Sequence, residues 1–226
     1  KSSTLAHQSE YAMVDAQIPV LNPSNVQEIL DYGLLGIALS RYAGVWVSMK
    51  CVTATMDSSA SVNVDLDRIK IKIPDFEMPA DGVHIRWPDE VLVQETRLSN
   101  IKLPAVKAFV KTNNINHSIW SKGNKNIGII STGKAYAEVR QALSDLNIDE
   151  TYAEKLGLHL FKVGMPWPLE DSGIIDFCSE MDEVIIFEEK RPLIEDQVKE
   201  IMYNQTNRPK RIIGKRDENN KEIIHS

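Results

Sequence analysis

The last hundred residues alternate between short apolar runs and longer amphipathic stretches, and this order constrains the fold more than any other feature of the chain. The apolar runs have strand length and lie in NIGIISTGK (126–134), LHLFKVG (158–164), EVIIFEE (183–189) and RIIG (211–214). Between them, AYAEVRQALSDL (135–146) and LIEDQVKEIMYN (193–204) show the spacing of helices that cover a sheet. Alternating strands and helices predict an α/β fold in three layers, with a parallel sheet and any ligand at the carboxyl ends of the strands.

An earlier unit, IPVLNPSNVQEILDYGLLGIALSRYAGVWVSMKCV (18–52), predicts one helix between two strands. Ser24 and Gln27 fit a capping box at the start of this helix, and Gly44 fits its end. VWVSMKCV (45–52) predicts a strand buried on both faces, as in parallel sheets. A single crossover of this kind cannot bury its own surface. We therefore expect the chain to be an internal fragment of a longer protein, cut by design or by proteolysis, and to self-associate through exposed apolar surface when isolated.

The segment between these two units has a different pattern. SVNVDLDRIKIKIP (61–74) alternates and predicts exposed-edge strands, and the prolines that follow indicate an irregular connection. Residues 89–113 have helical spacing interrupted by Pro104, which predicts two helices. The expected domains are therefore 1–57 and 122–226, with 58–121 as a partly structured linker.

Composition excludes several classes of protein. The formal net charge of −6 lacks the basic surplus that nucleic-acid binding needs. No apolar run approaches the roughly 18 residues of a membrane span, and no secretion signal opens the chain, so a cytoplasmic location is expected. Cys51 and Cys178 lie too far apart for a CxxC site, and the histidines are scattered, so no metal site is predicted.

Three polar segments are candidates for function. His7 and Glu10 precede an apolar run and can supply a proton donor and hydrogen bonds to a substrate carbonyl, or can simply form a polar loop. Residues 131–134 lie between a strand and a helix, where an anion is favoured, but they lack the spacing of a nucleotide loop, so a structural turn is the alternative. EEKR (188–191) is either a surface patch or a contact with another domain or subunit.

Four segments together closely resemble the indolepyruvate ferredoxin oxidoreductases, in the long fused form of this 2-oxoacid:ferredoxin oxidoreductase family found in proteobacteria. They are AHQSEYAMVDAQIPVLNPSNVQEILDYGLLGIALSRYAGVWVSMKCV, STGKAYAEVRQAL, KVGMPWPLE and VIIFEEKRPLIEDQVKE. The resemblance covers nearly the whole chain. It implies that residues 1–57 are the latter half of the domain that binds the pyrimidine ring of thiamine diphosphate, and that residues 122–226 resemble the C-terminal domain of transketolase.

The resemblance also implies a reaction. The family oxidatively decarboxylates aryl 2-oxoacids on thiamine diphosphate, passes electrons through iron–sulfur clusters to ferredoxin and releases an aryl-acetyl-CoA. In the family the HQSE loop lies at the edge of the cofactor and substrate pocket. The resemblance therefore gives His7 a catalytic role and places four neighbours in the pocket, namely Ser3, Thr4, Gln8 and Glu10. Lys134, Glu188 and Glu189 are candidates for an anion site or an interdomain contact.

The family's activating carboxylate, its GDG motif for magnesium and diphosphate, and its cluster cysteines are all missing from this sequence. We therefore expect thiamine diphosphate, Mg²⁺ and iron–sulfur clusters in the complete enzyme, none of them bound by this chain alone, and no activity of the isolated chain. The expected partners are the remaining domains, ferredoxin, the aryl 2-oxoacid, coenzyme A and a second copy in a homodimer. The alternatives are a free-standing α/β module that holds a small anion near residues 131–134, and a subunit that only docks other chains.

Overall fold

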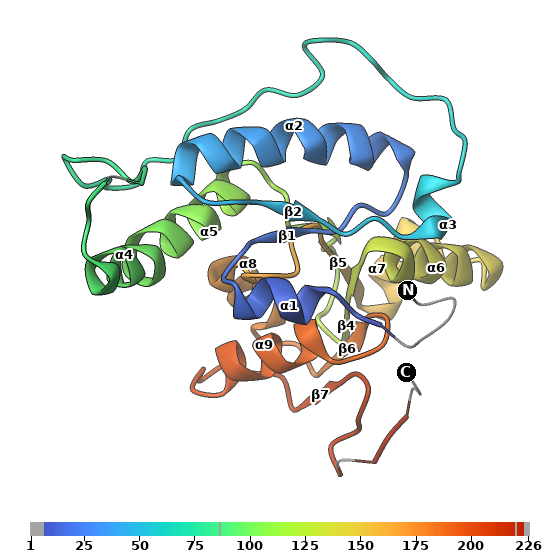
Figure 1. Ribbon diagram of the computed structural model, residues 1–226. Helices are drawn as coiled ribbons and strands as arrows, with labels where there is room; N and C mark the ends of the chain where they lie inside the picture. Colours follow the sequence, from blue (N-terminus) through green and yellow to red (C-terminus); the bar gives the residue numbers. More distant parts are fainter. Residues whose placement is uncertain (1–6, 86, 220, 224–226) are drawn as a thin grey trace.

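Two sheets organise the computed structural model, which describes residues 7–85, 87–219 and 221–223 (Figure 1). The small sheet pairs β1 (Val20–Leu21) with β2 (Ser48–Met49) in parallel. The large sheet has the order β3-β5-β4-β6-β7. Its strands are β3 (His117–Trp120), β4 (Ile127–Thr132), β5 (Leu158–Val163), β6 (Glu183–Phe187) and β7 (Arg211–Ile213). Only the edge strand β3 runs antiparallel, so the predicted α/β fold with a parallel-dominated sheet is confirmed.

Helices cover both faces of the large sheet. Helices α8 (Asp171–Cys178) and α9 (Leu193–Met202) pack on one face, over Ile130 and Ile186. On the other face lie α6 (Gly133–Asp145) and α7 (Glu150–Leu156), which enclose Ile129 and Leu160. Successive residues of a strand point to opposite faces, so the neighbours Ile129 and Ile130 enter different cores. This explains why the central strands are apolar throughout rather than alternating.

Helix α2 (Val26–Ala43) connects β1 and β2, as the spacing of its apolar residues predicts. Its N-cap is Asn25, whose side chain accepts a hydrogen bond of 2.9 Å from the Glu28 amide. The predicted Ser24–Gln27 capping box is therefore wrong by one position. The Glu28 carboxylate instead accepts from the Ser24 amide at 2.8 Å. Gly44 ends the helix in the left-handed conformation at φ 63°, as expected for a C-terminal glycine.

The segment before α4 arches over α2 as an irregular strap (Figure 1). No strand forms among the described residues from 57 to 90, so the strands predicted at 61–74 are wrong. The alternating side chains have no sheet to cover, and Leu66 is 92% exposed. Side chains of α2 hold the strap instead. Gln27 accepts from the Asn63 amide at 2.7 Å, and Asp31 accepts from Arg68 Nε at 2.9 Å.

One continuous helical run replaces the two helices predicted around Pro104. It consists of α4 (Val91–Arg97), a π-helical turn η1 (Leu98–Lys102) and α5 (Leu103–Thr112). Pro104 falls in the first turn of α5, directly after the π-helical turn. A proline at this point removes a donor where the hydrogen-bond ladder already changes its spacing, so the run continues.

Several short elements escaped sequence analysis. They are α1 (Glu10–Asp15), α3 (Thr53–Met56), β3, α7 and α8. The strands expected at 18–21 and 45–52 shrink to two residues each, β1 and β2. The large sheet begins with β3 at residue 117, five residues before the expected domain boundary. The division at 57 and 121 stays a prediction.

The two sheets share backbone hydrogen bonds and a hydrophobic core. The Val20 amide donates to the Trp167 carbonyl at 2.7 Å, and the Asn22 amide donates to the Gly164 carbonyl at 2.8 Å. Phe109 of α5 and Leu39 of α2 pack in one cluster with Met165, which follows β5. The region expected to be a linker thus contributes to the core between the sheets.

Replacing Leu39, which is fully buried in this cluster, should lower the free energy of unfolding. Leu39→Ala removes three carbons from a closely packed site, and the expected loss is about 2–5 kcal/mol. Leu34→Ala on the same helix is the matched control, because Leu34 is 45% exposed and should change stability by less than about 1 kcal/mol. Urea unfolding followed by circular dichroism measures both. Equal losses for the two variants would contradict the packing described here.

Candidate functional site

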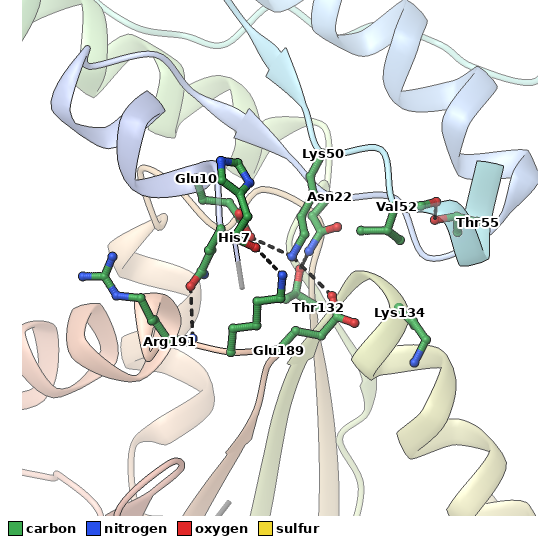
Figure 2. Close-up of polar contacts among 12 residues, drawn as sticks. His7, Glu10, Asn22, Lys50, Val52, Thr55, Thr132, Lys134, Glu189 and Arg191 are labelled. Atoms are coloured by element: carbon green, nitrogen blue, oxygen red, sulfur yellow. Dashed lines mark hydrogen bonds and ion pairs between the residues drawn. The ribbon is translucent and has the colours of Figure 1, made fainter. Parts of the chain in front are cut away.

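The carboxyl ends of both sheets meet at one polar junction (Figure 2). Asn22 follows β1 and Lys50 follows β2, while Thr132 ends β4 and Glu189 lies just after β6. Glu10, the first residue of α1, completes the group. We call these five residues the junction. Ligand sites of parallel α/β proteins lie at this end of the strands, where loops and helix termini gather.

An ion triad links three chain segments in the junction. Lys50 Nζ lies 2.7 Å from Glu10 Oε1 and 3.3 Å from Glu189 Oε2. Glu10 is only 4% exposed, and its second oxygen, Oε2, is buried without a hydrogen-bond partner in the described structure. A buried carboxylate oxygen without a donor costs free energy, so this atom is well placed to accept a hydrogen bond from a bound group.

The turn at residues 131–134 closes against the first sheet. Asn22 Nδ2 donates to Thr132 Oγ1 at 3.2 Å, and Thr132 Oγ1 donates to the Val163 carbonyl at 2.7 Å. Gly133 has φ +50°, and a Cβ at this position would lie 2.4 Å from Asn22 Oδ1. Lys134 forms an ion pair with Glu138 one helical turn later, which raises the pKa of Lys134. The Asn22 side chain therefore packs directly against this turn, and an anion near residues 131–134 stays a prediction.

The two polar segments chosen from the sequence lie against each other. The Lys190 ammonium donates to the His7 carbonyl, and the Arg191 amide donates to Gln8 Oε1 at 3.0 Å. The Arg191 guanidinium also stacks on the ring of Tyr11, 3.6 Å from its centroid. The His7 side chain is exposed. Ser3 and Thr4 lie outside the described residues, so their predicted place in the pocket stays a prediction.

Glu188 and Glu189 are adjacent but face different surroundings. Glu189 points to Lys50 in the junction, whereas Glu188 is buried beneath α9. There Glu188 accepts hydrogen bonds from the backbone amides of Ile194 at 2.8 Å and Glu195 at 2.9 Å. Burial raises the pKa of Glu188 to about 7, against the opposing effect of these hydrogen bonds. Glu188 is therefore a cap for α9, and Glu189 is the member of the pair that reaches the junction.

Two lysines that the sequence patterns did not single out also join distant segments of the chain. Lys50 belongs to the triad, and Lys162 of β5 forms an ion pair with Glu28 of α2. Lys162 also donates to Ser24 Oγ at 3.1 Å and lies 4.6 Å above the ring of Tyr136. Desolvation lowers the pKa of Lys162 to about 8. Each lysine lies in a mostly apolar run, WVSMKCV or LHLFKVG, and a charge inside such a run was the available signal.

The described residues offer polar contacts to a ligand rather than a metal site. No group of three or more His, Cys, Asp or Glu side chains among them could hold a metal ion. Both cysteines are free thiols, with Cys51 exposed and Cys178 buried in α8. Nor does the described chain contain a helix long and apolar enough to cross a membrane.

The fold is an α/β fold with two docked and mainly parallel sheets, and the junction lies at the carboxyl ends of their strands. The chain is similar in fold to a 2-oxoglutarate:ferredoxin oxidoreductase from Magnetococcus marinus, solved with 2-oxoglutarate, coenzyme A and succinyl-CoA bound. The TM-score is 0.51 at 13% identity, covering 86% of this chain and 38% of that chain. A match over 86% of this chain extends beyond the large sheet, whose first strand begins at residue 117.

Sequence comparisons point to indolepyruvate oxidoreductases. Residues 117–226 match the model of the indolepyruvate oxidoreductase domain. Over 191 residues the chain is 30% identical to indolepyruvate oxidoreductase subunit IorA of Archaeoglobus fulgidus and 28% identical to that of Pyrococcus abyssi. Residues 117–226 thus carry an indolepyruvate oxidoreductase domain, and the chain is similar to part of IorA. Each comparison covers 81% of this chain and 28% of the relative, so the chain spans about a quarter of the length of these relatives.

Gly133→Ala should loosen the contact between the two sheets. The substitution adds a Cβ against the Asn22 side chain at a positive φ, and the expected loss in the free energy of unfolding is about 2–4 kcal/mol. Gly82→Ala is the matched control, because Gly82 has φ +75° with nothing within 4 Å of an added Cβ. This control should lower the free energy of unfolding only by the strain of an alanine at a positive φ, which is about 1–2 kcal/mol. Urea unfolding separates the two, and losses of equal size would contradict the close approach of Asn22.

The raised pKa of Glu188 predicts a pH dependence of stability. Between its ordinary value of 4.5 and its folded value of about 7, the folded state binds a proton that the unfolded state releases. This contribution to the free energy of unfolding is fully present below pH 4.5 and is lost as the pH rises to 7. The stability of the wild type relative to Glu188→Gln should therefore fall by about 2 kcal/mol across this range. Urea titrations at several pH values measure the difference, and a difference that does not change with pH would refute the assignment.

Proposed function

We propose that the chain is part of an enzyme that oxidatively decarboxylates aryl 2-oxoacids, with indolepyruvate as the substrate, and forms aryl-acetyl-CoA with ferredoxin as the electron acceptor. The similarity to indolepyruvate oxidoreductases supports the reaction type. The observation that most directly supports the proposal is the buried Glu10 carboxylate at the carboxyl ends of both sheets. One of its oxygens pairs with Lys50, and the other has no hydrogen-bond donor among the described residues.

In this proposal the junction forms one wall of the cofactor and substrate pocket. Thiamine diphosphate supplies the electron sink for decarboxylation when it is bound, and the protein supplies binding, orientation and proton transfer. Lys50 holds Glu10 and Glu189 together, while Lys190 and Arg191 hold the backbone and side chain of residues 7 and 8. These contacts fix the segment that presents His7, whose exposed imidazole exchanges a proton with the substrate. Gln8 and Glu10 line the same edge of the pocket.

The rest of the machinery lies elsewhere in the complete enzyme. The described residues lack a metal site and a pair of neighbouring cysteines, so other domains hold Mg²⁺, the diphosphate and the iron–sulfur clusters. The isolated chain accordingly has no activity. The complete enzyme is a cytoplasmic homodimer of the long fused form, and it meets ferredoxin and coenzyme A through domains beyond this one.

The geometry around Lys134 favours this function over a free-standing anion-binding module. Asn22 packs against Thr132 and Gly133, and Glu138 pairs with Lys134. The turn at residues 131–134 and the Lys134 ammonium, which could each attract an anion, therefore already have partners within the chain.

Substitutions in the complete enzyme test the proposal. Glu10→Gln and His7→Gln should each lower kcat by about tenfold or more, because each removes a group that accepts or transfers a proton at the pocket. Lys134→Met should leave kcat within about twofold, since Lys134 only pairs with Glu138. Indolepyruvate-dependent reduction of ferredoxin measures the rate, and thermal unfolding of each variant checks that the fold is retained.

Two outcomes would contradict the proposal. Unchanged activity of both the Glu10 and His7 variants would remove the junction from the pocket. Loss of activity in Lys134→Met, together with saturable phosphate or coenzyme A binding that this variant abolishes, would instead support the anion-binding module.

A further inference from the structure

The turn between β6 and α9 contacts a segment that lies 183 residues earlier in the chain. The Lys190 ammonium donates to the His7 carbonyl, and the Arg191 amide donates to Gln8 Oε1 at 3.0 Å. The Arg191 guanidinium lies over the ring of Tyr11, 3.6 Å from its centroid. Two adjacent residues of the turn thus hold three positions of residues 7–11, which we call the His7 segment (Figure 2).

The His7 segment has few other contacts that fix its place. Glu10 pairs with Lys50 at 2.7 Å. In the part of the chain that the structure describes, the hydrogen bonds of His7 and Gln8 are those to the turn. The His7 side chain is exposed, so packing does not hold its imidazole. The position of the imidazole therefore depends on how the backbone around it is held.

The turn itself is anchored at both ends. Ile186 of β6 and Ile194 of α9 lie in the same buried core. Between them, the buried Glu188 carboxylate accepts from the Ile194 amide at 2.8 Å and from the Glu195 amide at 2.9 Å. Lys190 has φ 60°, a left-handed conformation that is uncommon for a residue with a side chain. A turn fixed in this manner can hold a segment that has little packing of its own.

Arg191 makes the most extensive contact with the segment. A cation over an aromatic face is attracted by the ring, and the planar guanidinium also stacks on it. Burial raises the pKa of Tyr11, and the nearby charge of Arg191 opposes this rise. The guanidinium holds Tyr11 while the amide of the same residue holds Gln8. One residue therefore fixes the segment at two points, one on either side of Glu10.

We propose that Arg191 is a positioning residue, which sets the place of the His7 imidazole through its contacts with Tyr11 and Gln8. This inference rests on the proposed function, in which His7 exchanges a proton with the substrate. A group that transfers a proton must lie within hydrogen-bond reach of the reacting atom, and a displacement of about 1 Å can lower the rate about a hundredfold. Arg191 does not touch the substrate and acts only through the His7 segment.

Arg191→Met in the complete enzyme tests the positioning role. Methionine keeps an unbranched side chain but loses the guanidinium, so kcat for indolepyruvate-dependent reduction of ferredoxin should fall about tenfold, with KM for the 2-oxoacid within about twofold. Tyr11→Leu removes the other side of the stack and should have the same effect. Arg208→Met is the matched control, because Arg208 is exposed and donates to the Tyr203 carbonyl. It should leave both constants unchanged.

A double variant separates positioning from general damage to the fold. If Arg191 acts only through His7, the enzyme with both His7→Gln and Arg191→Met should be as fast as His7→Gln alone, within about twofold. Losses that multiply in the double variant would overturn the inference. So would an unchanged kcat in Arg191→Met when His7→Gln is slow, an outcome that leaves the proposed function standing.

Hydrogen exchange of the complete enzyme, followed by mass spectrometry, gives a readout that does not depend on activity. The amides of Ala12 and Met13 donate to the Ser9 carbonyl at 3.0 and 3.3 Å, so exchange in residues 7–18 reports the order of the segment. This exchange should be about fivefold faster in Arg191→Met, while exchange in α9 should not change. Equal exchange in the wild type and Arg191→Met would overturn the inference alone. Faster exchange together with full activity of His7→Gln would overturn it along with the catalytic role of His7.

Discussion

The docking of the small sheet onto the large one holds the fold together and positions the junction. Strands β1 and β2 contribute only two residues each, and a two-stranded sheet of this size is not stable in water by itself. Backbone hydrogen bonds from Val20 to Trp167 and from Asn22 to Gly164 give it a partner. The helices α2 and α5 then close a core over the contact. The same docking brings the carboxyl ends of both sheets together, so fold stability and the position of the site have one physical origin.

The charges at this contact orient chain segments more than they stabilise the fold. Removing an ion pair from water costs about as much as the pair gains, so buried pairs such as Lys50–Glu10 contribute little net stability. These pairs nevertheless require a specific geometry, because a buried charge without a partner would cost free energy. The triad therefore determines where residues 7–10 lie relative to β6. The two adjacent carboxylates that follow β6 have different partners, because Glu189 enters this network while Glu188 caps α9.

The helices and strands whose apolar spacing reflects local burial were predicted correctly. The helix at 26–43 and the order of strands and helices after residue 126 follow from apolar spacing, which responds to whether one face or both faces are covered. The strands expected at 61–74 failed, because alternation shows only that a segment can pair, and no strand was there to pair with it. The break between two helices predicted at Pro104 was also wrong, because a π-helical turn accommodates this proline within one continuous helical run. In the site, the sequence indicated His7, Glu10 and the EEKR segment as candidates. It did not predict that these segments contact each other.

The α/β class, the helix α2, most strands of the large sheet and the resemblance to indolepyruvate oxidoreductases could all be predicted from the sequence. These depend on short-range spacing and on motifs, both of which are present in a linear string. Two features are visible only in the folded chain, namely that Lys50 bridges Glu10 and Glu189 and that Asn22 packs on the turn before α6. Each of these contacts joins residues far apart in the chain. Their geometry is set by how the two sheets dock, which is not encoded in the spacing of residues along one segment.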